Sequence, residues 1–261
     1  MRLTVIGCQG SFPGPGSPAS CYLVRAERDG RTWSVLFDLG SGALGALQRH
    51  LDLSSIDAIF LSHLHPDHCM DVCGLHVAVH WDPEGFRGER IAIHGPAETP
   101  DRLATAYGMP VDPGMHEDFD FRAIAAGEPV TVGPLTVEAF PVRHPVDEAY
   151  AFRITETLED GALRVLTYSG DTDACEALED AARGADVFLC EAAYHEGRDD
   201  AIEGVHLTGR RAGEAAARAG VGRLLLTHLP VWNDATRSVS EARGVFDGEI
   251  AVATAGVSYD V

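Results

Sequence analysis

Short apolar runs of strand length alternate along the chain with stretches whose apolar residues recur every three or four positions. The first pattern is typical of buried strands and the second of amphipathic helices. We expect strands at Arg2–Gly7, Cys21–Ala26, Trp33–Asp38, Asp57–Leu61, Ile91–His94, Leu135–Val142, Tyr150–Ile154, Leu163–Tyr168, Val187–Cys190, Arg223–Leu226 and Ile250–Ala253. We expect helices at Gly42–Leu51, Met70–His80, Glu98–Tyr107, Asp173–Arg183, Thr208–Ala219 and Ser238–Phe246. The alternation predicts an α/β protein with two blocks of strands and helices outside them.

One predicted strand is followed directly by a cluster of metal-binding side chains. Alternate residues of an extended chain point the same way, so His63 and His65 can bind one cation from one side. Pro66 then ends the strand and lets the next two ligands turn toward a second position. The cluster that follows the apolar run 57–61 consists of His63, His65, Asp67 and His68.

Further ligands are expected at three downstream places where a polar residue closes an apolar run. They are His144 after the run 135–142, Asp171 after 163–168, and His228 after 224–227. A lone histidine is usually a packing or surface residue, but this repeated arrangement is hard to obtain by chance. Imidazole and carboxylate together suit zinc, iron or manganese better than calcium or magnesium. The sequence therefore predicts a two-metal hydrolytic site.

With these motifs the chain resembles the metallo-β-lactamase superfamily, and within it the ribonuclease Z-like branch. The motifs that carry the resemblance extend over nearly the whole chain. The first is Val5–Ser11, a second is Leu36–Gly42, and the last is Leu226–His228. It implies a four-layer αββα sandwich with two divalent cations at one open edge, zinc or alternatively manganese or iron. The implied ligands are His63, His65 and His144 for one metal, Asp67, His68 and His228 for the other, and Asp171 as a bridge.

The resemblance also implies a mechanism, in which a hydroxide held between the two cations attacks the substrate. Asp67 would hold one metal and accept the proton of the nucleophile. His206 is the expected general acid, and Glu191 would hydrogen-bond it and raise its pKa. The alternative is that His206 caps the helix that starts near Thr208. Secreted β-lactamases of this fold commonly use cysteine in place of Asp171, so the resemblance speaks against antibiotic hydrolysis.

The net charge of −20 bears on the substrate. All 20 basic residues are arginines, and no basic run is present that would neutralise a long phosphate backbone. A field this negative repels polyanions at a distance, although metals and local arginines can still hold one small phosphate. We therefore expect a small phosphodiester as the substrate and no long nucleic acid. A solvated acidic surface is the alternative explanation of the charge.

A missing segment points the same way. Transfer-RNA-processing members of the branch carry a long basic arm, in many of them between the third histidine motif and the bridging aspartate. Here only residues 145–170 separate these two motifs, and the strands predicted within them form a hairpin that leaves no room for an arm.

The length of the chain and three of its motifs are similar to bacterial cyclic-nucleotide phosphodiesterases of this fold. These motifs are Ser17–Ser20, Gly45–His50 and Val187–Ala192. We expect hydrolysis of 3′,5′-cyclic AMP or a related cyclic nucleotide. The alternatives are a tRNA 3′-end endonuclease without its arm, a thioester or lactone hydrolase of the same superfamily, and a non-enzymatic metal-binding module.

Three features near the metal motifs complete the expected site. The glycine-rich loop Gly7–Gly16 is interrupted by prolines, so we expect it to border the metal cleft rather than to bind phosphate. Asp38, at the end of a strand, is a candidate to orient a metal histidine. His76, His80 and Trp81 follow the metal loop and are candidates to line the substrate entrance.

The organisation of the chain predicts a single domain over residues 1–261, because no linker or repeat divides it and the ligands are spread across it. Six scattered cysteines suit reduced thiols. No apolar signal segment or run of membrane-spanning length is present, so we expect a cytoplasmic protein without membrane contact. The resemblance also allows a homodimer, since homodimers are common in this branch, but no feature of the sequence indicates one.

Overall fold

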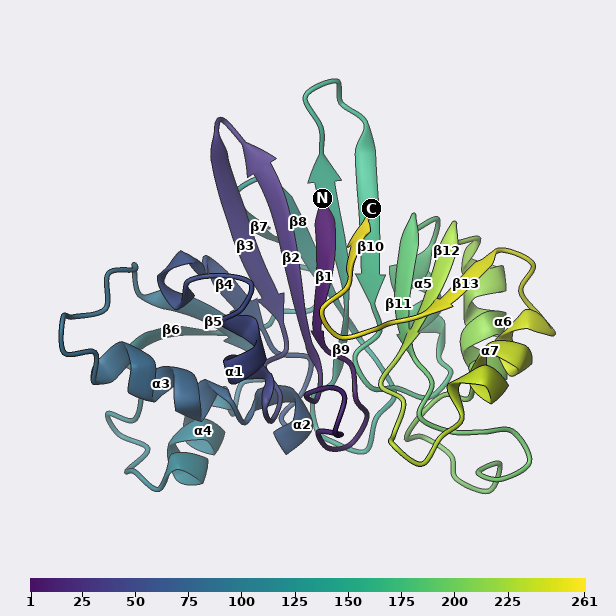
Figure 1. Cartoon of the computed structure of the whole chain (residues 1–261), viewed down its shortest axis with the longest axis horizontal. Coiled ribbons are helices and arrows are strands. Elements are labelled where there is room, and N and C mark those ends of the chain that lie inside the picture. Colours follow the sequence, from purple (N-terminus) through teal and green to yellow (C-terminus); the bar gives the residue numbers. More distant parts are fainter.

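Two mixed sheets of seven strands each form the centre of the molecule in the computed structural model, which describes residues 1–261 (Figure 1). The first sheet has the order β14 (Ser258–Asp260), β1 (Arg2–Gly7), β2 (Cys21–Arg28), β3 (Arg31–Phe37), β4 (Ala58–Phe60), β5 (Ile91–Gly95) and β6 (Phe119–Ala123). The second has the order β13 (Glu249–Val252), β12 (Arg223–Thr227), β11 (Val187–Glu191), β10 (Leu163–Tyr168), β9 (Tyr150–Thr157), β8 (Leu135–Pro141) and β7 (Val130–Val132).

Helices cover the outer face of each sheet. Those on the first sheet are α1 (Ala43–Leu47), α3 (Val72–His80) and α4 (Thr99–Tyr107), and those on the second are α5 (Glu176–Ala182), α6 (Gly209–Ala219) and α7 (Ala235–Arg243). A short helix, α2 (Pro66–Cys69), lies at the lower edge in Figure 1, and a 3-10 turn spans Leu53–Ser55. None of the helices combines the length and the apolar character that crossing a bilayer requires.

The core between the sheets is built from side chains that alternate strands point inward. Phe37 and Phe60 of the first sheet and Phe152 of the second are fully or nearly fully buried. Their ring centroids lie 5.5 to 5.7 Å apart, so the two sheets interlock through an aromatic cluster. Two further apolar cores lie between each sheet and its helices. This layering confirms the predicted αββα sandwich.

The structure corrects several predicted elements. Strands β6, β7 and β14 were not predicted, because they are short or half-polar edge strands that depend on pairing with a neighbour. The predicted helix from Met70 begins instead at Val72, and Pro66 opens the separate helix α2 at its first position rather than only ending a strand. β4 ends at Phe60, so His63 and His65, which follow it, lie in a loop and not in an extended strand.

His94 on β5 makes the stability of the fold dependent on pH. Its side chain is buried and stacks on Phe60 at 4.6 Å, and its Nε2 atom has no hydrogen-bond partner. Burial, and then the charge of Arg122, lower the pKa of His94 to about 4. An unfolded chain protonates histidine near pH 6.5, so the neutral buried ring loses stability as the pH falls from that value toward 4.

We expect the wild type to lose about 2 kcal/mol more of its unfolding free energy between pH 7 and pH 5 than the variant His94→Phe. Phenylalanine keeps the aromatic stack and removes the titrating group. Urea unfolding of both proteins at the two pH values measures the difference. Equal losses for both proteins would show that His94 does not titrate in this window.

Candidate metal centre

The loops that follow four strands meet at one edge of the sandwich, which is the lower edge in Figure 1. The side chains expected as ligands lie in these loops and in α2. They are His63, His65, Asp67 and His68 after β4, His144 after β8, Asp171 after β10, and His228 after β12. Residues 161 positions apart in sequence, such as Asp67 and His228, thus meet at one edge.

Three of the histidines converge on one point. His65 Nδ1 lies 3.0 Å from His63 Nε2 and 3.2 Å from His144 Nε2. Ligand nitrogens on one tetrahedral zinc ion stand about 3.3 Å apart, because each bond is about 2.0 Å long. The three ring nitrogens therefore have the spacing of ligands around a single cation.

A second group lies beside the first. His228 Nε2 is 3.3 Å from His68 Nε2 and 3.2 Å from Asp67 Oδ2. Asp171 Oδ2 lies 3.2 Å from His68 Nε2 and 3.8 Å from His63 Nε2, so it stands between the two groups. Its other oxygen, Oδ1, is buried without a hydrogen-bond partner. A buried carboxylate oxygen of this kind is costly unless a cation pairs with it, and the donor set fits two divalent metal ions.

Burial and local charge set the protonation states that metal binding needs. Burial lowers the pKa of His63 and of His144 below the ordinary value, so both rings are neutral near pH 7. Burial alone would raise the pKa of Asp171, but the charges of His228 and His68 outweigh it and hold that pKa well below its ordinary value. Neutral imidazoles and an ionised carboxylate are the forms that bind metals. Burial alone would lower the pKa of His68, but the charges of Asp171 and Asp67 outweigh it and raise that pKa well above its ordinary value, so this ring must release a proton when a cation binds.

A buried hydrogen-bond network orients His68. Asp38, the sequence candidate for this role, accepts hydrogen bonds from His68 Nδ1, the Ser62 amide and the Tyr168 hydroxyl, each at 2.7 Å. His68 Nδ1 is thereby turned away from the cluster and Nε2 toward it. Ser62 and Tyr168 were missed in the sequence. Their signal is weak, since Tyr168 is only the last residue of the strand that leads to Asp171.

Three non-glycine residues at the site have left-handed backbone conformations. They are Ser11 at φ 64°, Asp38 at φ 59° and His228 at φ 56°. Such conformations cost free energy and persist where the surrounding structure requires them, often at functional sites. The Ser11 amide donates a hydrogen bond to His228 Nε2 at 3.2 Å, so the loop Gly7–Gly16 borders the cluster as expected.

Close backbone packing fixes two of the loops that carry ligands. A Cβ atom at Gly40 would lie 1.9 Å from the carbonyl oxygen of Asp67, and one at Gly170 would lie 2.5 Å from that of Tyr150. Gly170 also has a φ of 57°, which favours glycine. Glycine at these positions lets α2 and the segment before Asp171 approach their neighbours.

His206 lies beside the cluster and is held by Glu191. His206 Nδ1 donates to Glu191 Oε1 at 2.8 Å, which is the expected hydrogen bond. Burial alone would lower the pKa of His206, but the charge and hydrogen bond of Glu191 outweigh it and raise that pKa to about 9. The helix α6 is capped by Thr208, whose hydroxyl accepts from the Arg211 amide, so His206 is not the cap.

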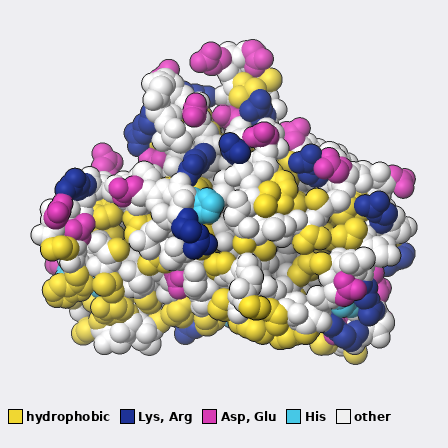
Figure 2. Space-filling view, in the orientation of Figure 1, with side chains coloured by type: hydrophobic (Ala, Val, Ile, Leu, Met, Phe, Trp, Pro, Cys, Tyr) yellow, Lys and Arg dark blue, Asp and Glu magenta, His cyan; other side chains and the backbone are white.

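A pocket of about 440 Å³ opens next to His206. It is lined by Ser11, Ala193, Tyr194, Arg198, Asp199, His206, Pro230 and Trp232. Phe12 packs against Trp232 with a centroid distance of 5.3 Å, and both side chains are exposed. Apolar side chains gather along the lower rim of the face in Figure 2, where Figure 1 places the loops after β1 and β12. Trp232 was missed in the sequence, where its signal is an aromatic residue four positions after His228.

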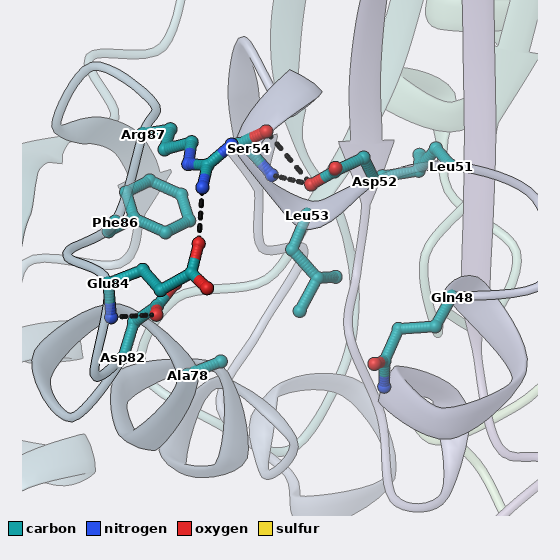
Figure 3. Close-up of a pocket in the computed structure, with 10 residues that line it drawn as sticks. All are labelled: Gln48, Leu51, Asp52, Leu53, Ser54, Ala78, Asp82, Glu84, Phe86 and Arg87. Carbon is teal, nitrogen blue, oxygen red and sulfur yellow. Dashed lines mark hydrogen bonds and ion pairs between the residues drawn. The ribbon is translucent and has the colours of Figure 1, made fainter.

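The largest cavity, of about 500 Å³, lies elsewhere, between α3 and the segment around the 3-10 turn. Figure 3 shows that most of its polar side chains bond to one another, while Gln48 stands apart from them. Arg87 pairs with Glu84, and Ser54 donates to Asp52. None of the residues that line this cavity belongs to the candidate ligand groups, whereas His206 lines the smaller pocket, so the smaller pocket is the candidate substrate site. His76, His80 and Trp81 line neither pocket.

The chain is similar to known proteins over its whole length. Residues 34–229 match the model described as the beta-lactamase superfamily domain. The chain is 44% identical to the uncharacterized protein ML1173 of Mycobacterium leprae, over 100% of this chain and 89% of that protein. It is 27% identical to a ribonuclease Z of Myxococcus xanthus, over 100% of this chain and 98% of that protein.

The chain is also similar to YhfI of Bacillus subtilis, which bears the description probable metallo-hydrolase. The two sequences are 30% identical over the full length of both proteins. The crystal structure of YhfI superposes with a TM-score of 0.82, covering 99% of each chain. The similarity therefore extends over the whole sandwich and not only over the metal motifs.

Proposed function

Because the chain belongs to the beta-lactamase superfamily, as a metallo-hydrolase of its ribonuclease Z-like branch, we propose that it is a two-metal phosphodiesterase for 3′,5′-cyclic AMP or a related cyclic nucleotide. The observation that carries the proposal is the convergence of seven ligands with Asp171 between the two groups. His206 stands at the side of these ligands, facing a pocket of about 440 Å³.

The proposed chemistry divides between the cations and the protein. Two divalent cations, when bound, act as Lewis acids toward water and phosphate near neutral pH. Asp67, which is 7% exposed, would hold one cation and accept the proton of the attacking water. His206, kept protonated by Glu191, donates a proton to the leaving oxygen of the ribose. Glu191 is fully buried and makes two further hydrogen bonds, to the amides of Thr172 and Ala193, so it holds the imidazole in one orientation.

The segment between His144 and Asp171 supports the proposal of a small substrate. The strands β9 and β10 pair as an antiparallel hairpin that points away from the metal edge in Figure 1. The turn closes through the Leu158 amide and the Ala162 carbonyl. Arginines are interspersed with acidic side chains on the face in Figure 2 and form no continuous basic strip there. With a net charge of −20, this surface opposes a long phosphate backbone.

The aromatic pair of Phe12 and Trp232 suits a planar base. Trp232 is 61% exposed and lines the pocket beside His206. Stacking of a base on an aromatic ring contributes about 1–3 kcal/mol.

We expect Trp232→Ala to raise the KM for cyclic AMP about tenfold with little change in kcat, because stacking acts equally on the ground state and the transition state. Trp232→Phe should retain most of the affinity. Trp81→Ala removes a similarly exposed tryptophan that does not line the pocket and serves as the control. Steady-state kinetics measure both constants. An unchanged KM in Trp232→Ala would show that the base does not stack on Trp232.

A second candidate function is 3′-end processing of precursor tRNA. The observation that favours it is the 27% identity to the ribonuclease Z of Myxococcus xanthus over nearly the whole of both chains. That activity requires the protein to bind the phosphate backbone of RNA. Binding of precursor tRNA should then weaken steeply as the salt concentration rises.

One assay separates the candidates. Purified protein loaded with zinc or manganese is offered 3′,5′-cyclic AMP, bis(p-nitrophenyl) phosphate, precursor tRNA and a thioester. We expect turnover of cyclic AMP with a kcat/KM above that for the other three substrates. Cleavage of precursor tRNA in preference to cyclic AMP would favour the second candidate, and turnover of the thioester alone would overturn both.

A further inference from the structure

A second cluster of ligand-type side chains lies on the outside of the first sheet. His76 and His80 are one turn apart on α3, and Asp118 immediately precedes β6. Asp118 Oδ2 is 2.9 Å from His76 Nδ1, and Asp118 Oδ1 is 3.0 Å from His80 Nδ1. None of the three belongs to the metal centre described above.

One atom of this cluster is left without a partner. The His76 side chain is 3% exposed, and its Nδ1 atom makes no hydrogen bond although the Asp118 carboxylate is close. The same carboxylate does hydrogen-bond with His80. The nitrogen and the carboxylate oxygen are close together, but their geometry does not allow a hydrogen bond. Two ligands that bind the same metal ion stand in this arrangement.

We propose that His76, His80 and Asp118 form a separate binding site for one divalent transition-metal ion, with zinc as the best match. Histidines four positions apart on a helix present their rings on the same face. The nitrogen-to-oxygen separations of 2.9 to 3.2 Å are near the edge length of about 3.3 Å for a tetrahedral zinc site. Two imidazoles and one carboxylate leave a fourth position for water.

The surroundings suit a site that is accessible but held in place. The His80 side chain is 36% exposed, which gives an ion a path from solvent. Tyr107 packs edge-on against His76 at 4.8 Å, and Trp81 packs against His80 at 4.7 Å. These rings limit the rotation of both imidazoles.

An ion bound there connects two parts of the chain. It would join the last turn of α3 to the segment before β6, which pack on the same side of the first sheet. The chain of α3 follows directly on α2, which carries Asp67 and His68. We infer a structural role for the ion, because none of the three residues lines one of the larger pockets.

The alternative for this cluster is an ordinary ion pair between Asp118 and protonated histidines, and metal content distinguishes the two. The protein is stripped with a chelator, reloaded with zinc, freed of excess metal and analysed by elemental mass spectrometry. We expect three zinc ions per wild-type chain, two in His80→Ala, two in Asp118→Asn and three in His116→Ala. His116 is an exposed histidine of the same segment and is the matched control.

Two results overturn the proposal: two zinc ions in the wild type, or three in His80→Ala with a wild-type circular dichroism spectrum. A further variant separates this site from the catalytic one. In Asp171→Ala, the addition of His80→Ala should remove one more ion per chain and lower the zinc-dependent rise in melting temperature. A double variant with the same zinc content and melting behaviour as Asp171→Ala contradicts the site, whatever the outcome of the activity assays.

Discussion

Replacing Asp171 with alanine is expected to lower kcat/KM for cyclic AMP by about 10³-fold or more, which corresponds to about 4 kcal/mol of transition-state stabilisation. Asp171 Oδ2 lies within 3.8 Å of ring nitrogens in both ligand groups, so its removal weakens the binding of both cations. The loss of activity should be accompanied by a loss of metal, measured on the same sample by elemental analysis.

The matched control for this variant is Asp160→Ala. Asp160 is an exposed aspartate in the turn between β9 and β10, far from the metal edge, and its replacement changes the net charge equally. Its activity and metal content should equal those of the wild type. Full metal content and activity within tenfold of wild type in Asp171→Ala would contradict the bridging position.

Replacing His206 with alanine is expected to separate catalysis from metal binding. His206 is held by Glu191 and stands 4.0 Å from Asp171, and it belongs to neither of the two proposed metal-ligand sets. We expect metal content to stay at the wild-type level and kcat for cyclic AMP to fall by about 10²- to 10⁴-fold. The fall should be much smaller for bis(p-nitrophenyl) phosphate, because p-nitrophenolate leaves without a proton.

The pH profile gives an independent test of the same role. A general acid works in its protonated form, and the pKa of His206 is raised to about 9, so kcat of the wild type should be maintained near neutrality and fall as the pH rises through this region. The alkaline fall should be absent in His206→Ala and present in His116→Ala. Near wild-type kcat on cyclic AMP in His206→Ala removes this residue from the mechanism.

The meeting of the candidate metal ligands at one edge could be predicted from the sequence because their signal is local. Each ligand follows an apolar run, and the end of a buried strand places the next residues at a sheet edge, as for Asp171 and His228. The αββα layers followed from the same runs together with the family resemblance. The hydrogen bond between His206 and Glu191 was also predicted and is present.

The remaining features depend on contacts between distant parts of the chain. Tyr168 reaches Asp38 across 130 positions, and no periodicity in either segment indicates that meeting. The edge strands β6, β7 and β14 form only because a neighbouring strand offers hydrogen bonds. The cluster of His76, His80 and Asp118 was missed for the same reason, since the aspartate comes from a separate segment.

We propose that seven side chains hold two cations at one edge of the sandwich, and anomalous diffraction from crystals grown with zinc or manganese would locate these cations. We expect two peaks about 4 Å apart, one among His63, His65 and His144 and the other among Asp67, His68 and His228, with Asp171 between them. A crystal with ample metal in which this edge shows no peak, or in which these side chains turn away from one another, would contradict it.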